Sequence, residues 1–235
     1  MKFGVVVFPG SNCDDDMVYV LGELLGAPVS KIWHKDYTLD GFGPEDCIIL
    51  PGGFSYGDYL RTGAMARITH IMSAVIEHAN NGGLVFGICN GFQILCESGL
   101  LPGVLLSNKS QRYISRNVHL RVETNRRLLT HSLEVGSILT MPMAHGDGRY
   151  YCDADTLKKL QENDQILFRY CNEDGDVQDI YTLNGSLDHI AGICNEAGNV
   201  FGMMPHPERA SEAVVGLVEG LILFENLQKN TVMQS

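Results

Sequence analysis

Short apolar runs alternate along the chain with longer segments in which apolar residues recur every three or four positions. Such short runs predict strands that are buried on both faces of a parallel sheet. Three of them lie at residues 3–8, 47–50 and 84–88, and residues 29–33 predict a weaker strand. The longer segments at 14–26 and 64–80 predict the helices between these strands. In the second helix the apolar stripe consists of Ile68, Ile71, Met72, Val75 and Ile76.

The pattern changes between about residues 104 and 151. Val118, Leu120 and Val122 alternate with polar residues, and residues 138–143 form another extended run. Alternation with a period of two is typical of strands with one face on the core and one toward solvent. The segment therefore predicts an antiparallel extension of the sheet.

The last part of the chain predicts a hairpin and one more helix. The runs 190–194 and 200–204 are joined by a short polar segment, which is the pattern of two paired strands. Helices are expected at residues 155–162 and 212–228. We predict an α/β fold: a central, mostly parallel sheet with helices on both faces and an antiparallel extension. No linker or repeat interrupts the chain, so residues 1–235 are expected to form one domain.

Composition and charge argue against several classes of function. The formal net charge of −11 argues against a nucleic-acid partner, because phosphate groups are bound by clustered Lys and Arg. No apolar run approaches the roughly 20 residues of a membrane span, and the N-terminus does not resemble a signal peptide. The seven cysteines lack Cys-x-x-Cys spacing, which predicts reduced thiols in a cytoplasm and neither a disulfide framework nor a metal site.

The sharpest local motif is Gly87-Ile88-Cys89-Asn90-Gly91, placed after a predicted strand and before a predicted helix. This spacing is the sulfur analogue of the nucleophile elbow, in which a sharp turn exposes the nucleophile and needs small residues two positions away. The helix N-terminus beside Cys89 favours a thiolate over a thiol. A buried structural cysteine between incidental glycines is the alternative.

A thiol nucleophile needs a base, and the base needs an orienting group. Pro205-His206-Pro207-Glu208 supplies both residue types. Two prolines favour an extended segment, in which positions i and i+2 point the same way, so Glu208 is expected to brace His206. The alternative is a surface turn with a solvated histidine. The predicted strand 200–204 argues against this alternative, because the strand leads His206 to the same sheet edge as Cys89.

The third motif is the Gly52-Gly53 turn after the predicted strand 47–50. Such a turn exposes backbone N–H groups that suit an oxyanion. We predict that the N–H groups of Gly53 and Asn90 form an oxyanion hole. A phosphate-binding loop is the rival interpretation, but the Gly-Lys-Ser/Thr of a P-loop and the spacing of a dinucleotide fingerprint are both missing.

Six segments together resemble the class I glutamine amidotransferases, most closely the members that serve purine biosynthesis. The resemblance covers about residues 3–225 and is weakest between 104 and 151. In chain order the segments are PGGFSYGDYLR, GICNGFQIL, MAHGDGRYY, NGS, IAGI and MPHPER.

The resemblance implies a flavodoxin-like glutaminase fold and assigns roles to matching residues. Cys89 matches the nucleophile, His206 the general base and acid, and Glu208 its orienting carboxylate. In this family the cysteine attacks the side-chain amide of glutamine, releases ammonia and forms a γ-glutamyl thioester that water hydrolyses. Substrate contacts are implied for Gln93, Ser55, Ala144, His145 and Gly146.

The resemblance also implies partners. No ATP site is recognisable in the chain, so ATP and Mg are expected to be used by a separate synthetase subunit, with a small accessory subunit beside it and no cofactor on this chain. A glutaminase subunit of another class I amidotransferase, a free-standing cysteine hydrolase on the same fold and an inactive homologue stay as alternatives. An arginine-rich stretch at 112–127 either faces an acidic partner or is an ordinary solvated surface.

Overall fold

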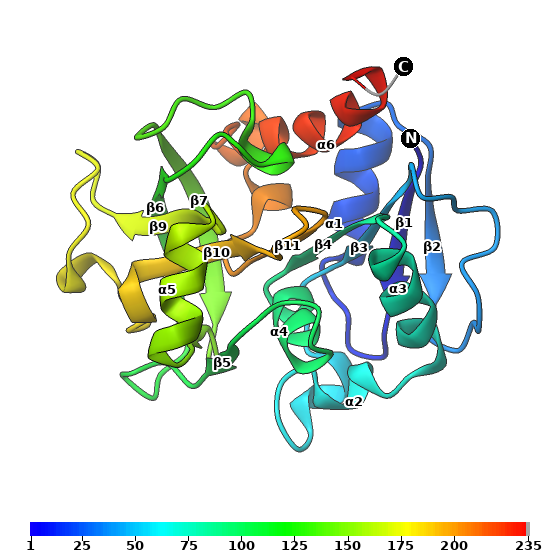
Figure 1. Cartoon of the computed structure of the whole chain (residues 1–235), viewed down its shortest axis with the longest axis horizontal. Helices are drawn as coiled ribbons and strands as arrows, with labels where there is room; N and C mark the ends of the chain where they lie inside the picture. The colour runs from blue at the N-terminus through cyan, green and yellow to red at the C-terminus, as the bar shows by residue number, and fades with distance from the viewer. Residues whose placement is uncertain (234–235) are drawn as a thin grey trace.

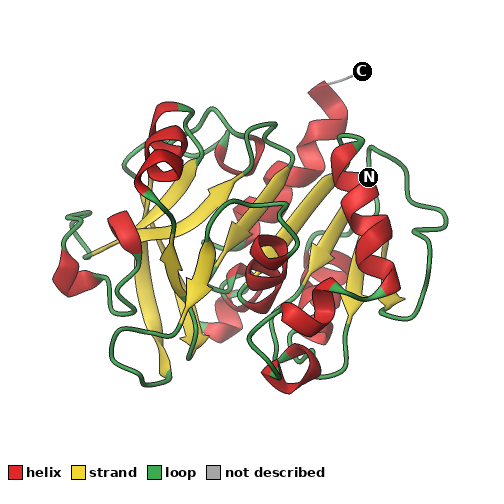
Figure 2. Ribbon diagram, turned by 60° about the horizontal axis from the view of Figure 1, so that its bottom comes forward, coloured by secondary structure: helices red, strands yellow, loops and turns green. Residues whose placement is uncertain are grey.

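The computed structural model describes residues 1–233, in which a nine-stranded sheet crosses the molecule with helices on both sides (Figures 1 and 2). The strand order is β2-β1-β3-β4-β11-β10-β9-β6-β7. Its strands are β1 (Phe3–Val7), β2 (Val29–Trp33), β3 (Cys47–Leu50), β4 (Leu84–Ile88), β6 (Ile114–Val122), β7 (Ile138–His145), β9 (Ile166–Cys171), β10 (Ile190–Cys194) and β11 (Val200–Met203). Two further strands, β5 (Val104–Leu106) and β8 (Arg149–Tyr151), pair with each other.

The first five strands in this order are parallel, and they follow the 2-1-3-4-5 order of a flavodoxin-like sheet. Strands β3, β4 and β11 are buried along their whole length, as their apolar composition predicts. The remaining strands are antiparallel: β10 forms a hairpin with β11, and β6 pairs with both β7 and β9. The predicted fold class, hairpin and antiparallel extension are confirmed.

Six α-helices are described: α1 (Asp14–Tyr19), α2 (Ala64–Arg67), α3 (His70–Asn80), α4 (Asn90–Glu97), α5 (Ala154–Glu162) and α6 (Leu221–Met233). A π-helical segment, Val20–Leu24, continues α1. Short 3₁₀ turns lie at Ser55–Asp58, Leu128–Thr130, Asp179–Tyr181, Leu187–His189, Pro207–Arg209 and Ala213–Val215. No helix among the described residues is long and apolar enough to cross a membrane.

The single helix expected over 64–80 is wrong, because the chain breaks between α2 and α3. Thr69 is extended (φ −75°, ψ 155°), and its hydroxyl donates to the Ala66 carbonyl at 2.7 Å. A threonine hydroxyl that satisfies the backbone locally competes with the helix. Ile68, which was counted in the apolar stripe, is consequently 72% exposed.

The final helix expected over 212–228 is also wrong at its beginning, since α6 starts only at Leu221. Gly216 has φ +86°, and the Glu212 N–H donates to the Leu217 carbonyl at 3.1 Å, which closes a loop instead of a helical turn. A Cβ at Gly220 would lie 2.1 Å from the Pro207 carbonyl oxygen. Close packing of this loop against the chain after His206 therefore overrides the helical pattern.

Part of the arginine-rich stretch is paired within the chain. Arg121 lies 2.7 Å from Glu123, and Arg126 lies 3.0 Å from Asp164. The Arg127 guanidinium donates to the carbonyl oxygens of Asp164 and Glu196 at 3.2 Å each. These three side chains tie the antiparallel half of the sheet together.

Candidate active site

The carboxyl ends of four parallel strands converge on one cavity. Segments that follow β1, β3, β4 and β11 meet at this sheet edge, which is where ligands bind in open α/β sheets. The cavity has a volume of about 140 Å³. Seven of the ten predicted site residues line it: Gly53, Cys89, Gln93, Ala144, His145, Gly146 and His206.

Cys89 occupies a strained turn between β4 and α4. Its backbone has φ 51° and ψ −105°, which a non-glycine residue rarely adopts. A Cβ at Gly91 would lie 1.9 Å from the Leu50 carbonyl oxygen, and one at Gly87 would lie 2.6 Å from the Gly91 backbone. Both glycines are thus required for the turn, and the predicted elbow geometry is present. The Cys89 Sγ lies 3.9 Å from the Ala144 carbonyl oxygen.

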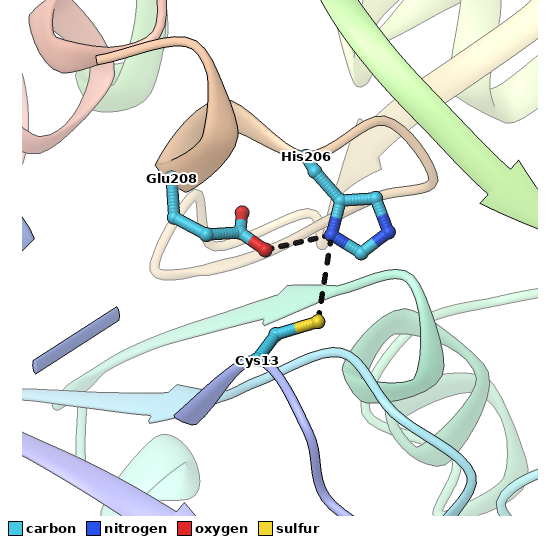
Figure 3. A group of neighbouring side chains, drawn as sticks. All are labelled: Cys13, His206 and Glu208. Carbon is cyan, nitrogen blue, oxygen red and sulfur yellow. Dashed lines mark hydrogen bonds and ion pairs between the residues drawn. The ribbon is translucent and has the colours of Figure 1, made fainter. Parts of the chain in front are cut away.

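His206 and Glu208 form a buried pair (Figure 3). The His206 Nδ1 lies 2.6 Å from the Glu208 Oε1, and the two residues are only 2% and 4% exposed. The extended segment expected here is wrong beyond His206, because Pro207–Arg209 forms a 3₁₀ turn. The Pro207 ring suits the start of such a turn, and the turn itself brings the carboxylate back to the imidazole.

Charge at this pair favours the imidazolium form. Burial opposes a charge on His206, but attraction by the Glu208 carboxylate and by Cys89 outweighs it, so the pKa of His206 lies well above its usual range. Because Nδ1 is used by Glu208, Nε2 is the ring atom left for other contacts. It is buried and has no hydrogen-bond partner among residues 1–233.

Cys13 is a second thiol at the pair, and sequence reasoning missed it. Its Sγ lies 3.9 Å from the His206 Nδ1 and donates to the Asn12 Oδ1 at 3.2 Å (Figure 3). Burial raises the pKa of the Cys13 thiol, which keeps it protonated at neutral pH. The signal that could have found it is its place just after β1, at the same sheet edge as Cys89.

The cluster of Cys13, His206 and Glu208 contains donor types that zinc prefers, with the three donor atoms within 4.8 Å of one another. However, the imidazole and the carboxylate already satisfy each other at 2.6 Å. A tetrahedral ion would have to separate them. We therefore assign no metal to the cluster.

Of the two residues predicted to form an oxyanion hole, Gly53 lines the cavity and Asn90 does not. Gly53 lines the cavity with φ +147°, and its N–H donates to no acceptor among the described residues. A Cβ at Gly53 would lie 2.7 Å from the Ser11 Cα, so only glycine fits there. Asn90 is the first residue of α4, where N–H groups have no intrahelical acceptor.

A chain of hydrogen bonds connects opposite walls of the cavity. The Ser55 N–H donates to the Asn90 Oδ1 at 3.2 Å, and the Asn90 Nδ2 donates to the Gln93 Oε1 at 2.9 Å. The Gln93 Nε2 then donates to the Asp147 carbonyl oxygen at 2.5 Å. Ser55, expected to contact substrate, is buried and is not among the residues that line the cavity.

His145 is neutral in this setting. Burial, together with the nearby His206, lowers the pKa of its imidazole to about 4. The His145 Nδ1 lies 3.1 Å from the Asn108 Oδ1, an oxygen that also accepts the Gly148 N–H. Nδ1 is therefore the protonated nitrogen, and Nε2 is an acceptor without a hydrogen-bond partner in the described part of the chain.

The cavity thus combines a thiol on an elbow, a buried imidazole braced by a carboxylate, and the Gly53 turn, with the N-terminus of α4 next to the thiol. Such a set can form and break an acyl thioester. Sequence reasoning missed six other polar lining residues, namely Asn12, Asp58, Thr62, Tyr113, Asp147 and Arg209. Asp58 and Asp147 lie within motifs that were noticed for their glycines, and Arg209 lies 3.1 Å from Asp16.

Comparisons with known proteins agree with this geometry. The chain is 50% identical over 234 residues to the phosphoribosylformylglycinamidine synthase subunit PurQ of Acaryochloris marina, which covers 100% of this chain and 98% of the relative. It is 52% identical over 227 residues to the protein of the same name from Koribacter versatilis, covering 97% of each. A solved structure of PurLQS from Thermotoga maritima contains a chain that matches with a TM-score of 0.85 and 43% identity, over 98% of both chains. The model of the CobB/CobQ-like glutamine amidotransferase domain matches residues 1–218. The chain therefore belongs to the glutamine amidotransferase family that this domain defines.

Proposed function

We propose that the chain is the glutamine-hydrolysing subunit of phosphoribosylformylglycinamidine synthase, in purine biosynthesis. Full-length relatives at about half identity carry that name, which supports the proposal. The observation that carries the chemistry is the shared cavity of Cys89, on its strained elbow, and of His206, which is paired with Glu208 at 2.6 Å.

In the first half of the reaction the Cys89 Sγ attacks the carbonyl carbon of the glutamine side-chain amide. The carbonyl oxygen becomes an oxyanion, which the N–H groups of Gly53 and Asn90 stabilise. His206 in its imidazolium form then gives a proton to the amide nitrogen as the C–N bond breaks. Ammonia leaves, and a γ-glutamyl thioester remains on Cys89.

In the second half a water molecule attacks the thioester. His206, now neutral, takes a proton from that water, and the C–S bond breaks to release glutamate and the free Cys89. Glu208 holds the ring so that Nε2 faces the reacting atoms, and it stabilises the imidazolium that forms. The attraction that raises the pKa of His206 serves the same purpose.

Ammonia then passes to a partner. We place the ATP- and Mg-dependent conversion of formylglycinamide ribonucleotide to the amidine on a PurL-type synthetase subunit, with a PurS-type accessory subunit beside it. The name of the Thermotoga maritima structure, PurLQS, supports such an assembly. The chain acts in the cytoplasm as a single glutaminase domain and needs no cofactor of its own.

The test is to assemble the chain with its synthetase and follow ¹⁵N from amide-labelled glutamine. We expect label in the amidine product, together with one glutamate per amidine. Cys89→Ser is expected to abolish the glutamine-dependent reaction while the complex still uses free ammonium. Transfer of the label to a different acceptor would instead indicate the glutaminase subunit of another amidotransferase, and glutamine hydrolysis that survives Cys89→Ser would contradict the assignment of the nucleophile.

A further inference from the structure

The loop that follows β3, residues 52–58, is held in a conformation that its own residues do not favour. Gly53 lines the cavity with φ +147°, while Tyr56 and Asp58 have φ +54° and +56°, which residues with side chains rarely adopt. Burial and the nearby Asp147 also raise the pKa of Asp58 to about 6, so the charge of Asp58 opposes its position. Contacts from other segments must therefore hold the loop in place.

Backbone contacts supply the first anchors of this loop. The Tyr56 N–H donates to the carbonyl oxygen of Pro9, in the turn after β1, at 2.6 Å. The Gly57 N–H donates to the Phe54 carbonyl oxygen at 2.8 Å, which closes a turn directly after Gly53. Because this turn is short, a shift of Tyr56 is passed on to the backbone of Gly53.

A side chain from the end of β2 supplies a further anchor. His34 directly follows β2, and its Nδ1 lies 2.6 Å from the Tyr56 hydroxyl. The residue is only 7% exposed, and its N–H donates to the Val7 carbonyl oxygen at 3.0 Å, which fixes its backbone. Burial and the nearby Lys35 lower the pKa of the imidazole against the attraction of Asp36, so His34 is neutral.

The Tyr56 hydroxyl is the donor in this contact. A phenol donates more strongly than an imidazole N–H, and a neutral imidazole nitrogen accepts more strongly than a phenol oxygen. The ring hydrogen of His34 is therefore on Nε2, which is buried and has no hydrogen-bond partner among residues 1–233. An unpaired buried N–H is costly, so this ring does not contribute its full hydrogen bonding to stability. Its polar contact in the described part of the chain is the one that fixes Tyr56.

We propose that His34 and Tyr56 are positioning residues that hold the Gly53 N–H where it stabilises the oxyanion. This inference rests on the proposed glutaminase function and extends it to two side chains away from the reacting atoms. Neither is among the residues that line the cavity, so both act through the loop 52–58. Because the oxyanion forms only as the substrate reacts, the pair should affect kcat more than KM.

The test measures kcat and KM for glutamine hydrolysis in the assembled complex. In Tyr56→Phe, which removes only the hydroxyl, we expect kcat to fall about five- to tenfold while KM stays within about twofold. His34→Ala should give the same loss, and the double variant should lose no more than either single variant, because both remove one contact. His34→Asn should restore most of kcat, because the Asn Oδ1 can replace Nδ1 as the acceptor.

The matched control is Thr182→Val in the antiparallel half. The Thr182 Oγ1 lies 2.6 Å from the His189 Nδ1, so a similar contact is lost away from the cavity, and kcat should stay within about twofold. Alkylation of Cys89 by iodoacetamide, which forms no oxyanion, should keep its rate in every variant and shows that the elbow has folded.

An unchanged kcat in Tyr56→Phe, a change in KM alone, or an equal loss of kcat in Thr182→Val would overturn the proposal. So would a parallel fall in the rate of alkylation, or no rescue by His34→Asn. Glutaminase activity of the unchanged complex tests the proposed function separately, so the two failures are distinguishable.

Discussion

His206 and Glu208 are joined by a 2.6 Å contact between Nδ1 and Oε1, although a single residue separates them in the chain and both are almost fully buried. The 3₁₀ turn at Pro207–Arg209 makes this contact possible by folding the carboxylate back onto the ring. A buried carboxylate at this distance fixes the tautomer of the ring and stabilises its positive charge. The pair therefore has two separable functions, orientation and charge.

Substitution of Glu208 can separate the orientation of the His206 ring from the stabilisation of its positive charge. Glu208→Gln keeps a hydrogen-bonding side chain but removes the charge, so the pKa of His206 should fall and kcat should drop less than in His206→Ala. For His206→Ala we expect a loss of about 10²–10⁴-fold, because both proton transfers fail. The measurement is kcat with its pH profile for each variant. Turnover and pH profile that are unchanged in Glu208→Gln would remove Glu208 from the triad.

Two thiols, Cys89 and Cys13, line the cavity, and a glutamine-analogue electrophile should react with only one of them. Burial raises the pKa of Cys13, so it stays a poorly reactive thiol, whereas Cys89 is at a helix N-terminus. Peptide mapping should find one adduct, on Cys89. Cys13→Ala should still be labelled and Cys89→Ser should not. A label mainly on Cys13 or Cys152 would contradict the assignment.

The two glycines of the elbow are predicted to be irreplaceable for steric reasons. In Gly91→Ala the new methyl group would lie 1.9 Å from the Leu50 carbonyl oxygen, which is backbone and cannot move away. We expect a loss of about 3 kcal/mol or more in the free energy of unfolding, measured in urea. Gly99→Ala, just beyond the other end of α4, is the control, since its methyl group meets nothing within 4 Å. It should cost only about 1 kcal/mol, from its positive φ. Similar losses in both would show that the clash is relieved by movement of the chain.

Sequence reasoning was accurate where a local pattern determines the structure. The strands at 29–33, 47–50 and 84–88 have the predicted bounds, and for the last two an apolar run bounded by turn residues leaves few alternatives. It failed where tertiary contacts determine where a helix begins or breaks. The break at Thr69 and the loop before Leu221 depend on a side-chain hydrogen bond and on close backbone packing that no periodicity reveals.

At the candidate active site, too, local motifs were predictable and contacts between distant segments were not. Cys89, His206 and Gly53 were identified because motifs with strict steric or chemical needs surround them. Asp58 and Cys13 were missed because their place in the cavity depends on which strand ends meet in space, and single acids and cysteines are common. Ser55, for which a substrate contact was predicted, is not among the residues that line the cavity, and its backbone N–H donates to the Asn90 Oδ1.

Asp58 should make stability depend on pH. Its pKa in the folded chain, about 6, lies above the ordinary value of 3.8, so its ionisation opposes folding. The penalty is absent below pH 3.8, develops between pH 3.8 and about 6, and is complete above that. Asp58→Asn, which tolerates the same positive φ, should therefore stabilise the chain at pH 8 by about 1 kcal/mol after solvent screening, or a few degrees in Tm. Calorimetry at pH 8 and pH 4 checks this, and stabilisation that persists at pH 4 would rule out the charge as its cause.

The loop that carries Asp58 has two distinct sides. Toward the cavity lie Gly53 and Asp58. Phe54 also lines the cavity, whereas Tyr59 and Leu60 face solvent and are 76% and 86% exposed. Tyr56, Asp58 and Leu60 all have positive φ, a strained arrangement that a bound partner could stabilise or change. Exposed apolar side chains on such a loop suit a protein interface.

We therefore predict that the synthetase sets the glutaminase rate through this loop, since uncoupled hydrolysis would waste glutamine. The measurement is kcat/KM for glutamine, for the chain alone and with its synthetase, ATP and formylglycinamide ribonucleotide. Activity should be low alone and rise at least about tenfold in the complex, as expected when docking completes an oxyanion site. The double variant Tyr59→Ser/Leu60→Ser should keep the basal rate and lose most of the stimulation, whereas Ile180→Ser, at an equally exposed apolar residue of the antiparallel half, should lose none. Full activity in isolation, unchanged by the partner, would refute this gating and leave the roles of Cys89, His206 and Glu208 intact.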